Sequence, residues 1–157
     1  MTKRTVTHDT FVIERKYPAA PARVFFALSD PRAKAKWFNG PEEWGPDQHT
    51  MDFRIGGRET SVGGPKEGPQ HRFEAIYQDI VPDQRIIYTY DMHLDDKRIS
   101  VSLTTLELGP EGTGTRLILT EQGAYLDEFD DPALRRRGTE DLLDALGASL
   151  QDAPANA

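Results

Sequence analysis

Alternation of apolar and polar residues with a period of two runs through most of the chain and predicts β-strands. In the first such stretch, residues 10–17, Phe11 and Ile13 share one face while Glu14 and Lys16 share the other. Turns rich in glycine, proline and aspartate separate the later stretches, which indicates an antiparallel meander. The later strands are expected at residues 50–55, 58–62, 73–81, 85–92, 98–108 and 115–122.

One strand has an irregular pattern. Within residues 98–108 the apolar positions Ile99, Val101 and Leu103 alternate with polar ones, but the parity then shifts to Leu106 and Leu108. Because each shift of one residue moves side chains to the other face of a sheet, a β-bulge is expected near residues 104–105. A glycine pair, Gly56 and Gly57, predicts a sharp bend after the strand at 50–55.

Helical periodicity is confined to three places. Short helices are expected at residues 22–28 and 31–38, the second after an aspartate and a proline. Residues 131–151 form the only long amphipathic pattern, and Asp131 before Pro132 is a good capping signal for its start. Its apolar stripe comprises Leu134, Leu142, Leu143, Leu146 and Leu150.

Clustered strands followed by a long helix predict an α+β fold rather than a doubly wound one. We expect a curved antiparallel sheet of about six or seven strands wrapped around one long C-terminal helix, with two short helices after the first strand. A length of 157 residues suits a single domain, residues 1–157, with a core at about 10–151 and tails at 1–8 and 152–157.

Composition removes several classes of function. The net charge of -7 argues against a nucleic-acid partner. The absence of cysteine excludes thiol catalysis and disulfides. No apolar run approaches the length of a membrane span and no signal-peptide core is present, so a cytoplasmic protein is expected. We expect no metal or cofactor, because no nucleotide fingerprint occurs and the histidines fall in separate segments: His8, His49, His71 and His93.

Five stretches, in order, resemble the START-like helix-grip superfamily (SRPBCC), in the branch of the activator of the heat-shock protein 90 ATPase and the bacterial polyketide-cyclase-like proteins. They are PAAPARVFFALSDPRAKAKWF, MDFRIGG, FEAIYQDIVPDQRIIYTYDM, TRLILTEQGAY and RRGTEDLLDALGASL. One departure is Thr139, where many members of that branch carry tryptophan after the helix glycine.

The resemblance implies a cavity between the helix and the sheet, and it does not imply one chemistry. Pockets for small molecules are mostly apolar with a few polar groups, which fits a row of tyrosines on one strand face. The opposing interpretation of that row is ordinary core packing. The candidate cavity residues are Trp37, Phe38, Phe53, Ile55, Phe73, Tyr88, Tyr90, Met92, Val101, Leu103, Leu119, Glu121, Gly138 and Leu142.

Three polar features remain open at this stage. Glu121 has the parity of Leu117 and Leu119 and either faces inward or lies at an exposed strand end. Asp52 and Arg54 are expected to pair at the surface. The arginines at 135–137 lie where the helix dipole disfavours cations, so pairing with the acidic residues at 127–131 is expected.

The leading hypothesis is a non-enzymatic or weakly enzymatic binder of a small hydrophobic or aromatic molecule, lipid- or polyketide-like, with no catalytic residue assigned. An enzyme on a polyketide-like substrate is the second, with Tyr88, Tyr90, His93 and Glu121 as its candidate groups. A chaperone ATPase co-factor is the third, and no compositional feature supports it. A homodimer through an exposed strand edge is compatible with the pattern.

Overall fold

A computed structural model describes residues 3–151 of the chain, so the predicted tail at 152–157 lies outside the described residues. The helices are α1 (Pro21–Ser29), α2 (Pro31–Ala35), the short 3-10 helix η1 (Glu42–Trp44) and α3 (Pro132–Ser149). The strands are β1 (Val6–Tyr17), β2 (Gln48–Met51), β3 (Arg58–Gly63), β4 (His71–Val81), β5 (Arg85–Leu94), β6 (Lys97–Glu111) and β7 (Gly114–Leu126).

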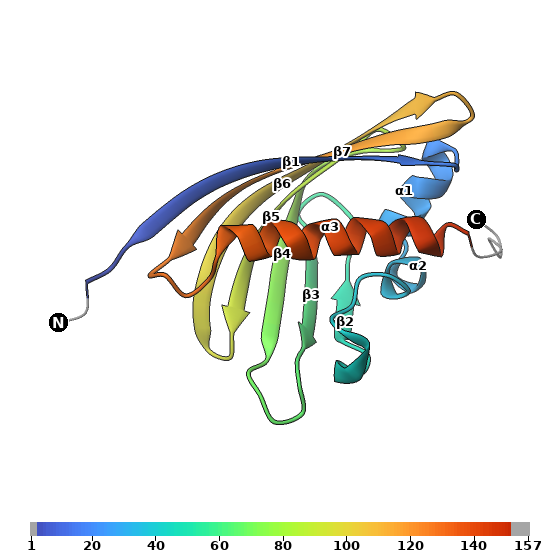
Figure 1. Cartoon of the computed structure of the whole chain (residues 1–157). Helices are drawn as coiled ribbons and strands as arrows, with labels where there is room; N and C mark the ends of the chain where they lie inside the picture. Colours follow the sequence, from blue (N-terminus) through green and yellow to red (C-terminus); the bar gives the residue numbers. More distant parts are fainter. Residues whose placement is uncertain (1–2, 152–157) are drawn as a thin grey trace.

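The seven strands form one antiparallel sheet in the order β1-β7-β6-β5-β4-β3-β2. The sheet curves, and α3 lies along its concave face, with its C-terminal end beside α1 and α2 (Figure 1). The predicted α+β architecture is therefore confirmed. We call the face toward α3 the inner face of the sheet.

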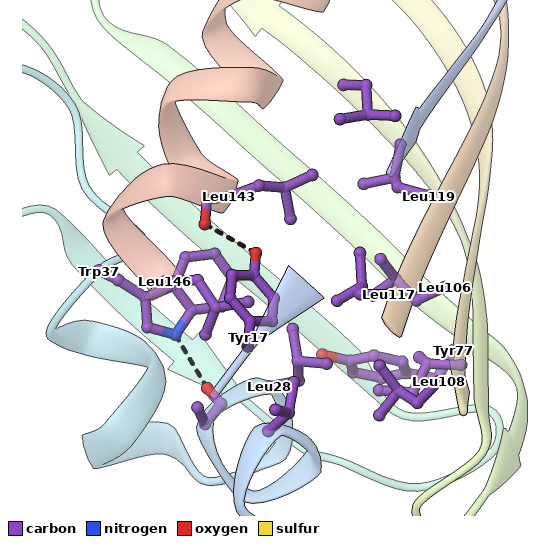
Figure 2. Close-up of a cluster of buried hydrophobic side chains, with 14 of the residues drawn as sticks. Tyr17, Leu28, Trp37, Tyr77, Leu106, Leu108, Leu117, Leu119, Leu143 and Leu146 are labelled. Carbon is purple, nitrogen blue, oxygen red and sulfur yellow. Dashed lines mark hydrogen bonds between the residues drawn. The ribbon is translucent and has the colours of Figure 1, made fainter. Parts of the chain in front are cut away.

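The main core lies between the second half of α3 and one end of the inner face. Leu143 and Leu146 of α3 point toward Leu117 and Leu119 of β7 (Figure 2). The Tyr17 hydroxyl donates a hydrogen bond of 2.7 Å to the carbonyl of Leu143, which ties the end of β1 to the helix. Burying these side chains stabilises the fold by about 2 kcal/mol each, so this half of α3 holds the helix on the sheet.

The two halves of α3 bury different kinds of side chain. Asp131 caps the helix as predicted, because its carboxylate accepts the backbone N–H of Ala133. Leu134 does not continue the apolar stripe: it is 59% exposed, so this prediction was wrong. The first turns place Arg135 rather than a leucine toward the sheet, and the apolar stripe begins at Leu142.

The predictions for the strand at 50–55 and for β6 are also partly wrong. The strand expected at 50–55 ends at Met51, because the chain turns there: Asp52 N–H bonds the carbonyl of Arg58, and Gly56 adopts a φ of 84°. Ile55 is consequently 59% exposed, whereas Phe53 packs against the main core. The predicted bend at the glycine pair is confirmed.

The bulge expected near residues 104–105 of β6 is absent, since the pairing of β6 with β7 runs without interruption through these positions. The irregularity lies instead in the β5–β6 pairing, between Met92 and His93. Continuous alternation turns Val101 and Leu103 outward and buries three hydroxyl-bearing side chains on the inner face: Ser100, Ser102 and Thr104.

Candidate functional site

The inner face under the first half of α3 carries an aromatic cluster that adjoins the main core, because Phe38 and Tyr88 contact both. We define it as Phe38, Phe73, Tyr88 and Tyr90, together with Met92. Phe73 is central: its ring centroid lies 4.9 Å from that of Tyr90 and 5.1 Å from that of Phe38. Phe38, Tyr88 and Met92 stay only partly buried, so the cluster is less completely packed than the main core.

A buried carboxylate, Glu121, lies next to this cluster. It stands between Phe11 of β1 and Thr104 of β6 in the strand register and is 2% exposed. One carboxylate oxygen accepts the hydroxyl of Tyr90 at 2.8 Å, and the other accepts that of Thr104 at 3.0 Å. Glu121 therefore faces inward, which answers the question that its sequence parity left open.

Arg135 brings a cation from the first turn of α3 into the same place. Its guanidinium donates to the Tyr90 hydroxyl at 3.0 Å, to Ser100 at 2.9 Å and to the Asp130 carboxylate at 2.5 Å. Its nitrogen lies 3.9 Å from the Glu121 carboxylate. The predicted pairing of the arginines with the acidic connector is thus confirmed for Arg135. We call these residues the Glu121 network: Glu121, Tyr90, Thr104, Arg135, Ser100 and Asp130.

The charge of Glu121 is incompletely compensated. Burial raises the pKa of its carboxyl group above the ordinary value, and the contacts with Tyr90, Arg135 and Thr104 offset only part of that effect. Arg135 is shared with Asp130, which is the closer of its two carboxylate partners. The network consequently holds two carboxylates against one cation.

A second buried carboxylate, Glu59 of β3, lies nearer the β2 edge. Lys34 of α2 donates to it at 2.8 Å and His49 of β2 contacts it at 2.7 Å. The Tyr77 hydroxyl donates to the same oxygen as Lys34. We call these four residues the Glu59 network. Burial opposes ionisation of Glu59, but Lys34, His49 and Tyr77 together lower the pKa of its carboxyl group to about 2.

The Glu59 network also borders the aromatic cluster. The Lys34 ammonium lies 4.4 Å from the ring centroid of Phe38, a cation–π contact that follows from the helical spacing of four residues. Its side chain is 5% exposed. The amine is therefore held between a carboxylate and an aromatic face, and it fixes α2 to the sheet.

The first half of α3 presents small or polar residues above the aromatic cluster. Arg135 and Thr139, one helical turn apart, are partly buried, and the Thr139 hydroxyl bonds the carbonyl of Arg135. Gly138 between them is exposed, and a Cβ atom added there would meet no heavy atom within 4 Å. Gly138 is therefore not required for close packing of α3 against another element.

The structure brings together only part of the predicted site. Phe38, Phe73, Tyr88, Tyr90 and Met92 form one cluster, with Glu121 beside it. Trp37, Leu119, Phe53 and Leu142 instead belong to the main core or pack against it, and the Trp37 indole N–H bonds the carbonyl of Ala27. The remaining candidates do not face this cluster: Ile55, Val101 and Leu103 point outward, and Gly138 is exposed.

Three further features lie outside the aromatic cluster. Asp52 and Arg54 form an exposed pair at 2.9 Å, as predicted. Trp44 stacks on His71, with centroids 5.0 Å apart, rather than on the aromatic cluster. His93 lies opposite Arg72 on the outer face, which removes it from the inner-face acids and bases.

That outer face carries a shallow depression of about 480 Å³. Its lining is mostly charged or polar, and it comprises Val62, Gln70, Arg72, Glu74, His93, Asp95 and Asp96. Within the described chain, no set of three or more His, Asp or Glu side chains is arranged to hold a metal ion. No helix among residues 3–151 is long and apolar enough to cross a membrane.

Sequence reasoning missed most polar members of the site. Lys34 and Glu59 lie 25 residues apart, and the polar positions that alternate with Ile99, Val101 and Leu103 lie on the inner face, opposite to the face that their polarity suggests. One signal lies in β3, where Glu59 and Ser61 occupy alternate positions of the strand. Alternate positions share one face of a sheet, and here that face is the inner one. For β6, the hydroxyls follow the parity of Leu106 and Leu108, which extends the buried face backwards.

Comparison with known proteins places the chain in a family. The family model for activator of Hsp90 ATPase homolog 1-like protein matches residues 18–151. The chain belongs to this family. It is a START-like (SRPBCC) family, as the ordered stretches of sequence indicated. A search of curated proteins gives no match.

Solved structures from the same family are close in both sequence and shape. A protein from Rhizobium leguminosarum is 44% identical over 97% of this chain and 100% of its own, with a TM-score of 0.92. A protein from Rhizobium loti is 46% identical over 92% of this chain and 99% of its own, with a TM-score of 0.86. A Chromobacterium violaceum protein is 29% identical over 92% and 98%, with a TM-score of 0.78.

Proposed function

We propose that this protein binds a small hydrophobic or aromatic molecule between the inner face of the sheet and the first half of α3. Proteins with this fold commonly bind hydrophobic ligands. The observation that carries the proposal is the aromatic cluster, which lies beneath helix residues that do not cover it with apolar side chains.

The physical argument concerns unfinished packing. A helix that only served to cover the sheet would place leucines above Tyr88 and Met92, as its second half does above Leu117. Here the helix offers Arg135 and Thr139 instead, and partly buried aromatic surface remains on the inner face. An apolar ligand would complete this packing and gain about 25 cal/mol for each Å² of apolar surface that it buries.

Thr139→Trp tests the proposal with little risk to the fold. Thr139 is partly buried on the side of α3 toward the sheet, so an indole there would fill the space that the ligand needs. Titration with a neutral solvatochromic naphthalene dye should give saturable binding to the natural protein and at least tenfold weaker binding to the variant. Native mass spectrometry of the purified protein provides an independent search for a retained small molecule.

Asp141→Trp is the matched control. Asp141 lies two residues along the same helix, on its exposed side, so its indole should leave dye affinity unchanged. Equal affinity of the natural protein and Thr139→Trp would contradict the proposal. So would the absence of saturable dye binding to the natural protein.

An enzyme that uses Glu121 as an acid is the second candidate. One observation favours it: burial raises the pKa of the Glu121 carboxyl group, and Tyr90 connects that group to the aromatic cluster. Turnover of an enolisable polyketide-like ketone, lost in Glu121→Gln while dye binding persists, would support catalysis. Equal turnover by both proteins would remove this candidate.

A further inference from the structure

Two buried hydroxyl groups on the inner face have no hydrogen-bond partner within residues 3–151. They belong to Ser102 of β6 and Tyr125 of β7, whose side chains are 3% and 1% exposed. Leaving a buried hydroxyl unpaired is destabilising, so such groups in a folded protein require an explanation. The neighbouring hydroxyls of Ser100, Thr104 and Tyr90 are all bonded within the Glu121 network.

The two hydroxyls share one neighbourhood, and Gly123 is the reason. Gly123 pairs with Ser102 across β6 and β7. A Cβ atom at Gly123 would lie 3.1 Å from Cζ of the Tyr125 ring and 3.2 Å from the Ser102 hydroxyl oxygen. The Tyr125 ring and the Ser102 hydroxyl therefore both border the space beside Gly123 that any larger residue would fill.

This place adjoins the proposed ligand site. Ser102 stands directly opposite Tyr90 of the aromatic cluster in the β5–β6 register. The Arg135 guanidinium lies 5.3 Å from the Tyr125 ring centroid and 5.6 Å from that of Tyr90. A ligand lying on the aromatic cluster would thus present its nearest polar atom to the hydroxyls of Ser102 and Tyr125.

The surrounding charges decide which polar atom is suitable. Three carboxylates act on this place: Glu121, Asp130 and Asp9, the last opposite Gly123 in β1. Arg135 is the one cation among these groups, and Asp130 already holds it at 2.5 Å. Burial, together with these carboxylates, raises the pKa of Tyr125 to about 12, so its phenol stays a neutral donor. A further anion would be repelled here.

We infer that Ser102 and Tyr125 form the polar end of the ligand site and that they bind a neutral oxygen, a carbonyl or hydroxyl group, on an otherwise apolar ligand. The inference rests on the proposed function and specifies the ligand class of that site. Each hydroxyl can donate to a carbonyl lone pair, and a carbonyl has two lone pairs to accept them. A hydrocarbon would leave both hydroxyls unpaired, and a carboxylate would face the excess of negative charge.

The test compares probes that share a naphthalene ring and differ in one group. The probes are naphthyl methyl ketone, ethylnaphthalene, naphthoate and naphthylmethylammonium, each measured by displacement of the neutral dye. The ketone should bind about five- to tenfold more tightly than ethylnaphthalene, as one net hydrogen bond provides, and more tightly than either ion. A carboxylate or ammonium probe that binds as well as the ketone would overturn the inference.

Tyr125→Phe and Ser102→Ala assign the preference to these residues. Both remove an unpaired hydroxyl without changing shape, so the variants should unfold at an unchanged or higher temperature. In each variant the affinity for the ketone should fall to that for ethylnaphthalene, while the affinity for ethylnaphthalene stays the same. A preference for the ketone that survives both substitutions would overturn the inference.

Tyr17→Phe is the control for loss of a buried phenol. Its hydroxyl bonds the carbonyl of Leu143 in the main core, so the variant should lose stability and keep the ketone preference. Loss of the preference in this variant as well would count against a specific role of Tyr125. If no probe displaces the dye because the dye itself does not bind, the proposed function fails, and the inference fails with it. Dye binding without a ketone preference defeats the inference alone.

Discussion

Glu59 and Glu121 are both almost fully buried on the inner face, yet their surroundings differ. Glu59 has Lys34 to itself, together with His49 and Tyr77, and its carboxyl pKa falls to about 2. Glu121 accepts two neutral hydroxyls and lies 3.9 Å from an arginine that Asp130 holds more closely; its carboxyl pKa is raised by burial. The first arrangement is compensated and fastens α2 to the sheet. The second is only partly compensated and lies beside the proposed ligand site.

The comparison shows two different roles for a buried carboxyl group. A compensated pair resists removal of either partner, because the remaining charge would be buried alone. A carboxyl group that is only partly compensated can take up a proton instead. The charges around it then favour ligands of one charge over ligands of another. Four substitutions measure this contrast, beginning with the largest expected effect.

Lys34→Met should cost about 4 kcal/mol of unfolding free energy, because it leaves Glu59 ionised and buried without its cation. Urea denaturation at neutral pH measures the loss. Arg54→Met is the control, since the exposed Asp52–Arg54 pair is expected to contribute less than about 1 kcal/mol. A loss for Lys34→Met no larger than that of the control would show that Glu59 is not a compensated charge.

Acid titration should reveal Glu59 directly. Its folded pKa lies below the unfolded value, so the unfolded state binds more protons between those two values. The stabilisation is present above the unfolded value of 4.5 and is lost as the pH falls toward about 2, a change of about 3 kcal/mol. Glu59→Gln should remove this part of the acid transition in urea melts between pH 5 and about pH 2. An unchanged acid limb would contradict the assignment.

Arg135→Met should cost less than Lys34→Met, about 2 kcal/mol. The variant loses charged hydrogen bonds to Ser100 and Tyr90, but Glu121 can take up a proton and Asp130 keeps partial contact with water. The comparison uses the same urea assay as for Lys34→Met. A loss equal to or above that of Lys34→Met would mean that Glu121 is as strictly ionised as Glu59.

Glu121→Gln should have the smallest effect, and its sign should be opposite to that of Glu59→Gln. The folded pKa of Glu121 is raised, so the folded state binds more protons and stability falls as the pH rises through that folded value. The amide cannot ionise, so the variant should keep its stability over the same rise. The thermal midpoints of both proteins, measured from pH 4 to pH 8, should diverge in this direction; parallel curves would contradict it.

The fold was predictable because its elements follow simple periodicities. Period-two alternation located the strands, and the cap at Asp131 located α3. The face of β6 was predicted wrongly because apolar residues were taken to point inward, whereas Val101 and Leu103 lie outside and serines lie inside. Local sequence carries only the parity of Leu106 and Leu108 as a signal for this, since the partners of Ser100 and Thr104 come from α3 and β7.

The candidate site was predictable to the same extent. Tyr88, Tyr90 and Met92 share a face on one strand, so their alternation identified them. Lys34, Glu59 and Arg135 make their contacts with residues far away in the chain, and no spacing rule connects those positions. The prediction for Leu134 was wrong for a related reason. The first turn of α3 faces polar groups of the sheet, and Arg135 rather than Leu134 points inward.

The pairing of the first strand with the last one has a consequence for biosynthesis. β1 lies at an edge of the sheet and pairs with β7. Val6 therefore pairs with Leu126, a residue more than a hundred positions later in the chain. A chain emerging from the ribosome can assemble the β2 to β6 meander first, but β1 stays an unpaired strand until β7 has been synthesised. Such strands are prone to associate with other chains. Contacts of this separation also slow folding, so we expect the sheet to be completed only after β7 has left the ribosome.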